Sequence, residues 1–209
     1  MRLLEFQAKE LFRNYGINLL PSKASTTIEE GRKHAKELGY PFVIKIQVPV
    51  GGRGKAGGIQ KCQNDDEFEL KYPQVLGLVI KGEKARAILL EKMADIKKEL
   101  YLSLFLNRSK RCYTIIASPE GGVEIESVKN QIIREVGLGE VSDQVAKEVA
   151  KEMKLEGKTA DDFADILQKL AKLTVEKEAE LAEINPLAIM QDGSLMALDG
   201  KFVTDDNSN

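Results

Sequence analysis

The sequence predicts an α+β fold, in which helices pack beside β-hairpins in a chain of 209 residues. Three observations support this class. Apolar residues recur at helical spacing near the N-terminus and again over 142–177. Two pairs of apolar segments, 98–107 with 112–117 and 181–189 with 194–198, are each joined by a short polar turn, which is typical of a hairpin. No internal repeat, low-complexity tract or long linker divides the chain.

Capping residues place the helices along the chain. Gly16 ends the first helix, as expected of a C-cap. A second helix begins at Thr27, which forms a capping box with Glu30, and runs to Gly39. A short third helix is predicted over 64–71. The apolar positions that define the first helix are Leu4, Ala8, Leu11, Phe12 and Tyr15.

The predicted strands lie between these helices and after them. Residues 118–126 are expected to form a turn and a further strand, and Gly157 is expected to separate two C-terminal helices. The final hairpin turns about Asp192-Gly193. The predicted strands are 42–48, 58–62, 86–92, 98–107, 112–117, 181–189 and 194–198.

A single lysine, Lys45, interrupts the apolar strand 42–48, which opens into a basic, glycine-dense loop. Buried strands seldom hold a lysine unless an anion meets its ammonium group. We interpret this segment as a phosphate grip, a flexible flap able to close over a nucleotide. The alternative for the loop alone is a mobile turn with solvated cations. The loop contains Gly51, Gly52, Arg53, Gly54, Lys55, Gly57 and Gly58.

Two familiar phosphate-binding motifs do not fit this loop. Gly52, Gly54 and Gly57 match G-x-G-x-x-G, but the dinucleotide fingerprint requires a helix to follow at once, and the next residues read as a strand. A P-loop requires Ser or Thr after its Gly-Lys, and Lys55 is followed by Ala56. The pattern that remains is strand, glycine loop, strand.

The composition, 43% hydrophobic and 31% charged, is that of a globular chain. Residues 1–120 contain 21 Lys or Arg against 14 Asp or Glu, whereas residues 121–209 contain 10 against 19. The front part therefore suits an anion and the back part a cation, although solvated helix faces also account for acidic residues. Dispersed cations without an aromatic ladder argue against nucleic acid. No apolar run approaches membrane-spanning length and no signal peptide is recognisable, so we expect no membrane partner and a cytoplasmic location.

Acidic residues at strand ends are candidate ligands for a nucleotide. Glu91 ends one strand and Glu99 begins the next, where each can accept hydrogen bonds from an adenine amino group or from ribose hydroxyls. Ordinary solvation of strand ends is the alternative.

Glu183, Asn185 and Asp199 offer hard oxygen ligands from neighbouring strands, the type of ligand that magnesium prefers. The register of the final hairpin determines whether these three side chains can lie on the same face. A strict two-residue turn pairs Pro186 with Asp199 and puts Asn185 on the opposite face. We therefore predict either a three-residue loop or a bulge at Pro186, because only these place all three side chains on one face.

The remaining reactive residues read as structural. His34 is the only histidine, lies in a basic helix and is expected at the surface, so a phosphorylated or proton-shuttling histidine is expected on another chain. Cys62 and Cys112 fall in strand-like segments and are expected to be reduced packing residues.

These segments together resemble the N-terminal ATP-grasp region of the β subunit of succinyl-CoA synthetase, the ADP-forming succinate–CoA ligase, over essentially the whole chain. The resemblance lies in the opening segment 4–16, in Lys45 with its glycine loop, in 95–101 with 120–126, and in the final hairpin. The matching motifs there are Glu183-Ile-Asn-Pro-Leu187 and Leu198-Asp-Gly-Lys201.

The resemblance implies an ATP-grasp fold, in which two α+β lobes clamp ATP. The small lobe would cover about 20–92 and the other about 1–19 and 93–209. By position, the resemblance gives Lys45, Gly52, Arg53 and Gly54 to phosphates; Glu91, Ala94 and Glu99 to base and ribose; Asn185 and Asp199 to Mg²⁺; and Glu183 to the phosphohistidine of the α subunit. The implied reaction converts succinate, CoA and ATP to succinyl-CoA, ADP and phosphate in the tricarboxylic acid cycle.

One departure from the family pattern is large. Family β subunits continue into a flavodoxin-like C-terminal domain, and this chain stops soon after the predicted metal hairpin. A truncated chain or a split subunit would explain this, and we expect the chain alone to bind Mg-ATP without forming succinyl-CoA. Alternatives are another acid–CoA ligase, such as a malate–CoA ligase or an ATP-citrate-lyase-like subunit, and a non-catalytic nucleotide-binding assembly module. Ala94, where relatives can carry a hydroxyl residue, leaves GTP possible beside ATP.

Overall fold

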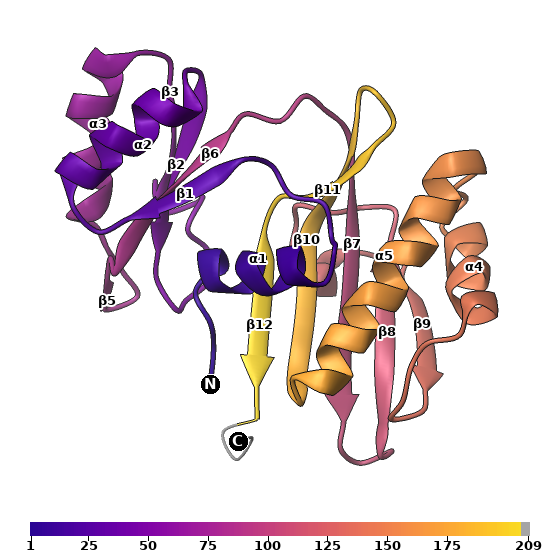
Figure 1. Cartoon of the computed structure of the whole chain (residues 1–209). Coiled ribbons are helices and arrows are strands. Elements are labelled where there is room, and N and C mark those ends of the chain that lie inside the picture. The colour runs from indigo at the N-terminus through magenta and orange to yellow at the C-terminus, as the bar shows by residue number, and fades with distance from the viewer. Residues whose placement is uncertain (206–209) are drawn as a thin grey trace. The chain divides into compact units, whose positions relative to one another are not determined.

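The computed structural model describes residues 1–205 and divides into two compact units (Figure 1). Unit 1 consists of Met1–Leu19 and the chain from Asp95 onward, and unit 2 consists of Leu20–Ala94. The larger lobe expected from the sequence extends to residue 209, and its residues 206–209 lie outside the described part. Each unit has its own antiparallel sheet and its own hydrophobic core.

Unit 2 is a four-stranded antiparallel sheet in the order β1-β6-β2-β3, with two helices on one face. The order is not that of the sequence, because β6 inserts between β1 and β2. A separate two-stranded ribbon, β4 with β5, follows the second helix. The elements are β1 (Ser22–Ser25), α2 (Ile28–Leu38), β2 (Phe42–Gln47), β3 (Ile59–Cys62), α3 (Asp65–Leu76), β4 (Val79–Ile80), β5 (Glu83–Lys84) and β6 (Ala87–Lys92).

The two-residue period of β2 sorts its side chains between the two faces of this sheet. Phe42, Ile44 and Ile46 belong to the core cluster that includes residues of α2 and α3, and all three are fully buried. Each such side chain contributes about 1.5–3 kcal/mol of hydrophobic stabilisation. Lys45 and Gln47 have the opposite parity and therefore lie on the other face of the sheet.

Unit 1 is a six-stranded antiparallel sheet in the order β11-β10-β7-β8-β9, with β12 also pairing with β10. Strand β10 is long enough to pair with β11 through one part and with β12 through another. The elements are α1 (Glu5–Asn14), β7 (Ile96–Asn107), β8 (Cys112–Ser118), the 3-10 helix η1 (Ile125–Ser127), β9 (Ile132–Val136), α4 (Asp143–Glu152), α5 (Gly157–Glu176), β10 (Ala179–Met190), β11 (Leu195–Ala197) and β12 (Gly200–Thr204).

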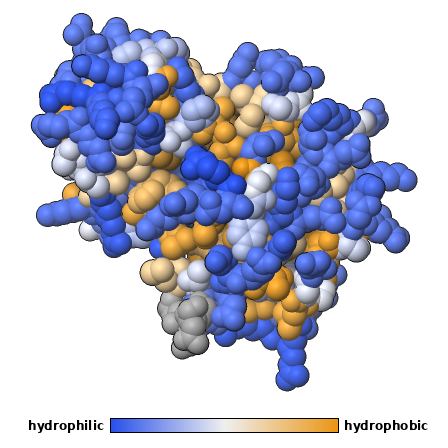
Figure 2. Space-filling view, viewed as in Figure 1, coloured by the Kyte–Doolittle hydropathy of each residue, from blue (hydrophilic) through white to orange (hydrophobic). Residues whose placement is uncertain are grey.

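Helix α5 supplies much of the core of unit 1. It packs against β10 and β7, with α4 beside it, and α1 packs against β12 (Figure 1). Its outward face carries i,i+4 ion pairs, for example Lys158 with Asp162 and Lys169 with Asp165, and Figure 2 shows hydrophilic side chains over α4 and α5. Much of the acidity after residue 120 therefore belongs to solvated helix faces. The buried positions of α5 include Phe163, Ile166, Leu167, Leu170 and Leu173.

The predicted helices are confirmed, with one correction. Thr27 accepts a hydrogen bond from the backbone N–H of Glu30, and Gly39 is the C-cap of α2. The carboxylate of Glu30 accepts from Thr26, one residue before the position expected of a capping box. Helix α3 continues to Leu76 instead of ending at residue 71, although Pro73 removes one of its backbone donors. Burial of Tyr72 and Val75 in the core of unit 2 explains the extension.

The predicted strand within 118–126 is wrong. The segment forms a turn and then η1, and the next strand is β9. The backbone N–H of Gly121 donates to Glu99 and that of Gly122 donates to the side chain of Asn185, so neither is available for a ladder with β8. Strands β1 and β12 were also not predicted, because each is a short segment without clear alternation.

Across residues 1–205, every helix falls short of the length or the hydrophobicity that crossing a bilayer requires. Both cysteines are free thiols, as expected, and burial raises the pKa of Cys62 to about 11. His34 differs from the expectation of a surface residue. It is half-buried in α2, and its Nδ1 is buried without a hydrogen-bond partner in the structure.

Candidate functional site

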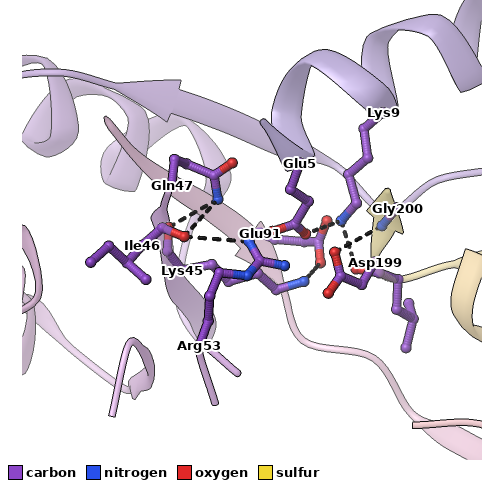
Figure 3. A network of polar contacts seen from close by, with 10 residues as sticks. Glu5, Lys9, Lys45, Ile46, Gln47, Arg53, Glu91, Asp199 and Gly200 are labelled. Atoms are coloured by element: carbon purple, nitrogen blue, oxygen red, sulfur yellow. Dashed lines mark hydrogen bonds and ion pairs between the residues drawn. The ribbon is translucent and has the colours of Figure 1, made fainter. Parts of the chain in front are cut away.

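The candidate site residues fall into two groups, one in each unit. In unit 2, Lys45 lies opposite Leu89 in the β2–β6 ladder, so Glu91 is its diagonal neighbour. The ammonium group of Lys45 contacts the carboxylate Oε1 of Glu91 (Figure 3). An anion therefore does meet the strand lysine, as charge burial requires, and within the protein that anion is Glu91. The resemblance assigns Lys45 to the phosphates of a nucleotide and Glu91 to its base and ribose. In the structure the two side chains form an ion pair with each other.

The glycine loop after β2 is held by its own backbone. Gly58 N–H donates to the carbonyl of Arg53 at 2.8 Å, and the carbonyl of Gly58 accepts from Ile46 at 2.8 Å. A Cβ on Gly58 would overlap the side chain of Ile46, so only glycine permits this approach. Gly52, with φ of 85°, requires a left-handed backbone. The loop is a folded turn whose tip is exposed at Gly52 and Gly54.

Side-chain contacts join the loop to the strand that carries Lys45. Arg53 donates through Nη1 to the carbonyl of Ile46 at 3.3 Å (Figure 3). Gln47, which the sequence analysis did not single out, donates through Nε2 to the carbonyls of Lys45 and Ile46, both at 3.2 Å. Ala94 is half-buried and is the last residue of unit 2. This arrangement places two cationic side chains beside a backbone rich in exposed glycine, which is the chemistry that a phosphate chain requires.

In unit 1, the hairpin register decides which side chains share a face. Met190 N–H donates to the carbonyl of Ser194 and Leu187 lies opposite Ala197, so the loop contains three residues. Asn185 then lies opposite Asp199, whose carbonyl accepts from the Asn185 N–H at 3.2 Å. The three-residue alternative is confirmed, and Asn185 and Asp199 are cross-strand neighbours on one face.

The side chain of Asn185 is fixed on both of its polar atoms. Its Oδ1 accepts from the N–H of Gly122 at 2.7 Å, and its Nδ2 donates to the carbonyl of Val123 at 3.0 Å. The carboxylate Oδ1 of Asp199 accepts from the N–H of Gly200 at 2.8 Å. One carboxylate and one carboxamide form a donor set that suits magnesium, which usually keeps several waters and substrate phosphates as its other ligands. Within residues 1–205, no cluster of three or more His, Cys, Asp or Glu side chains offers a metal site of its own.

Helix α1 supports the Asp199 segment through a buried ion pair that the sequence analysis missed. Lys9 Nζ lies 3.0 Å from Glu5 Oε1 and donates to the carbonyl of Leu198 at 2.8 Å (Figure 3). Both side chains of the pair are 2% exposed. The signal available in the sequence was the i,i+4 spacing of Glu5 and Lys9 on the apolar side of the first helix. Lys9 therefore fixes the backbone one residue before Asp199.

Glu183 is hydrogen-bonded to Tyr101, another residue that the sequence analysis did not single out. The hydroxyl of Tyr101 donates to Glu183 Oε2 at 2.9 Å. Desolvation, followed by the charge of Glu183, raises the pKa of Tyr101, so the phenol remains a hydrogen-bond donor over the physiological range. Glu99, Tyr101 and Ser103 are every second residue of β7, so their side chains lie on the same side of the strand. Ser103 lies opposite Glu183. Glu99, Glu183, Asn185 and Asp199 thus belong to adjoining segments of one unit, whereas Lys45 and Glu91 belong to the other.

Unit 2 groups cationic side chains with a glycine loop, and unit 1 groups oxygen ligands. Comparison with known families identifies the class of protein. The chain belongs to the ATP-grasp domain family, whose pattern matches residues 2–189. Sequence similarity to curated relatives extends over essentially the whole chain. The chain is 41% identical over 214 residues to succinate–CoA ligase (ADP-forming) subunit beta of Chloroflexus aggregans, covering 99% of this chain and 56% of the relative. The corresponding subunit of Deinococcus radiodurans is 40% identical and is covered over 56% of its length. The chain thus spans just over half the length of the relatives it matches.

Solved structures give the same fold at lower sequence identity. A dinucleotide-forming acetyl-coenzyme A synthetase 1 of Ca. Korarchaeum cryptofilum, in complex with coenzyme A, Ca-AMPCP and HgCl+, superimposes with a TM-score of 0.83 at 22% identity, covering 98% of this chain and 93% of that one. ATP citrate lyase from Methanothrix soehngenii superimposes with a TM-score of 0.75 at 21% identity and is covered over 51% of its length. These likenesses confirm the predicted ATP-grasp fold.

Proposed function

We propose that this chain is the nucleotide-binding part of the β subunit of an ADP-forming succinate–CoA ligase. The observation that carries the proposal is 41% identity over 99% of the chain to subunits of that name. The local geometry supports it, because each unit presents one of the two charge types that a Mg-nucleotide requires: cations and a glycine loop in unit 2, and oxygen ligands in unit 1.

The residues take the following roles in this proposal. Lys45, Arg53 and the loop Gly52–Gly54 bind the phosphates of ATP, and Glu91, Ala94 and Glu99 line the base and ribose. Asn185 and Asp199 hold Mg²⁺, which neutralises phosphate charge when bound. Glu183 faces a phosphohistidine that belongs to an α subunit. The position of His34 within α2, with its Nδ1 buried, agrees with the histidine coming from another chain.

The chemistry assigned to this chain is positioning and charge neutralisation. The γ-phosphoryl group of ATP passes to the partner's histidine and leaves ADP, and it then passes to a succinate carboxylate. CoA thiol displaces phosphate from the acyl phosphate to give succinyl-CoA, the reaction that we assign to the tricarboxylic acid cycle. The sequence distance from the solved acetyl-coenzyme A synthetase and ATP citrate lyase, 18–22% identity, leaves them as evidence of fold alone.

Calorimetric titration of the chain with ATP and with GTP, each with and without Mg²⁺, tests this proposal. We expect Mg-dependent binding of ATP, and a loss of about tenfold or more in affinity for Lys45→Met and for Asp199→Asn, since each removes a charge from the proposed site. Lys61→Met, which removes an exposed cation from the neighbouring strand β3, is the matched control. Binding that ignores magnesium and survives both site variants would contradict the proposal.

A second experiment tests the assembly. Addition of an α subunit with [γ-³²P]ATP should label a histidine on that subunit, and succinyl-CoA should not form from the 209-residue chain alone. Full turnover without a partner would refute the assigned division of labour. Partner binding that is indifferent to nucleotide would favour an assembly module instead.

A further inference from the structure

The segment Gly121–Val123 connects two candidate ligand residues through its backbone. The N–H of Gly121 donates to the carbonyl of Glu99 at 3.0 Å. The N–H of Gly122 and the carbonyl of Val123 bind the two polar atoms of the Asn185 side chain, at 2.7 Å and 3.0 Å. No side chain of the segment takes part in these three hydrogen bonds.

These contacts determine which way the amide of Asn185 points. The segment offers a donor at Gly122 and an acceptor at Val123, so a flipped amide would set two donors against each other and two acceptors against each other. The carboxamide oxygen has two acceptor positions, of which the Gly122 N–H takes one. The other position remains for a cation, and its direction is set by the segment.

Glycine is required here for two separate reasons. Gly122 has φ of 72°, a left-handed conformation, and a Cβ on it would overlap the carboxylate of Glu99. A Cβ on Gly121 would overlap the backbone of Leu100. A side chain at 121 must therefore displace the segment from the backbone of β7, and one at 122 must displace either the segment or the carboxylate of Glu99.

We propose that Gly121–Val123 is a positioning element that sets the direction of the Asn185 ligand oxygen and fixes the backbone of Glu99 beside it. The inference rests on the proposed function, in which Asn185 is a magnesium ligand and Glu99 a nucleotide ligand. Loss of a group that orients a metal ligand typically costs 10–100-fold in metal affinity or activity. The segment therefore affects the binding of a metal–nucleotide complex although it contacts neither the metal ion nor the nucleotide.

The test compares Gly122→Ala with Gly157→Ala in the 209-residue chain. Gly157 also has a left-handed φ, of 54°, but a Cβ there meets nothing within 4 Å, so this control carries the backbone strain alone. We expect Gly122→Ala to weaken Mg-dependent ATP binding by about tenfold or more, and Gly157→Ala to change it less than about twofold. Equal effects from the two variants, or an unchanged affinity for Gly122→Ala, would overturn the proposal.

A second variant serves if Gly122→Ala does not fold. Asn185→Asp retains an oxygen for the metal and adds a negative charge, but it loses the donor to Val123. We expect it to bind Mg-ATP more weakly than the unaltered chain, because two acceptors then face each other. Tighter binding would show that direction is unimportant and would overturn the inference.

Nuclear magnetic resonance separates failure of this inference from failure of the proposed function. The side-chain amide signals of Asn185 in the nucleotide-free chain should shift in Gly122→Ala and stay in place in Gly157→Ala. Unshifted signals in Gly122→Ala overturn the positioning role whatever the chain binds. If the unaltered chain binds no Mg-ATP, the proposed function fails, and with it the ligand role that the segment was inferred to serve.

Discussion

At the scale of single residues, the Glu5–Lys9 pair contributes differently from most of the charged pairs. Both side chains are 2% exposed, whereas the i,i+4 pairs on α4 and α5 are open to solvent. Exposed pairs contribute little because water screens them. A buried pair contributes little net stability by itself, but removal of one of its members is strongly destabilising, because charges in a desolvated site interact strongly with their partners.

This difference gives a stability prediction. Lys9→Met removes the ammonium group from Glu5 and the hydrogen bond to the carbonyl of Leu198. We expect the free energy of unfolding, measured in urea, to fall by about 3–5 kcal/mol. Lys169→Met is the matched control, since Lys169 likewise pairs with an acid four residues earlier and donates to a carbonyl, that of Gly16, but is 35% exposed. The control should lose about 1 kcal/mol or less, and equal losses would contradict the assigned role of burial.

At the scale of elements, carboxylates at helix N-termini make the stability of unit 2 depend on pH. Hydrogen bonding from the N–H of Thr26 lowers the pKa of Glu30 at the start of α2. Pairing with Lys71, together with the N–H of Gln63, lowers the pKa of Glu67 at the start of α3. A carboxyl group whose pKa is lower in the folded state stabilises the fold when ionised. That stabilisation is complete above the unfolded value of about 4.5 and is lost as the pH falls through the folded value.

We therefore expect the free energy of unfolding to decrease as the pH falls from about 5.5 toward 3. Glu30→Gln and Glu67→Gln should each reduce the slope of this decrease, because the substituted residue no longer titrates. Gln74→Ala, at an exposed position of α3 that carries no titrating group, is the control and should leave the slope unchanged. Urea unfolding followed by circular dichroism across this range measures the effect, and parallel curves for all variants would contradict it.

The elements also show what a sequence can and cannot predict. Periodicity and caps located α1, α2, α4 and α5, since these depend on residues close in the chain. The 118–126 segment was mistaken for a strand because its hydrogen bonds go to Glu99 and Asn185, which are distant in sequence. Lys9 and Tyr101 were missed for the same reason. Their partners, Leu198 and Glu183, are fixed by tertiary packing and by sheet order, which local patterns do not encode.

At the scale of the whole molecule, the two units differ in how the chain builds them. Unit 1 draws on two separate stretches of sequence, and unit 2 on the single stretch Leu20–Ala94. The core of unit 2 is formed entirely by residues of that stretch, including Phe42, Phe68 and Tyr72. All the ladder partners of its four-stranded sheet lie within the same stretch.

We expect residues 20–94 to fold when expressed alone, with modest stability, because a core of this size supplies only about 3–5 kcal/mol. A dispersed nitrogen–proton correlation spectrum and a cooperative thermal transition would support this. As a control, Phe68→Ala should abolish the transition, since it removes a ring at the centre of the core. A spectrum typical of an unfolded chain would contradict the expectation.

The length of the loop in the last hairpin determines on which side of the sheet Asp199 lies. Shortening 191–193 by one amino acid would move every residue after it by one position along β10, and Asp199 would exchange its side of the sheet with a neighbour. All the chemical groups would still be present, yet the carboxylate would point away from Asn185. Among natural variants of this chain, hairpin length is therefore as diagnostic of a working cation site as the identity of the side chains that would bind it.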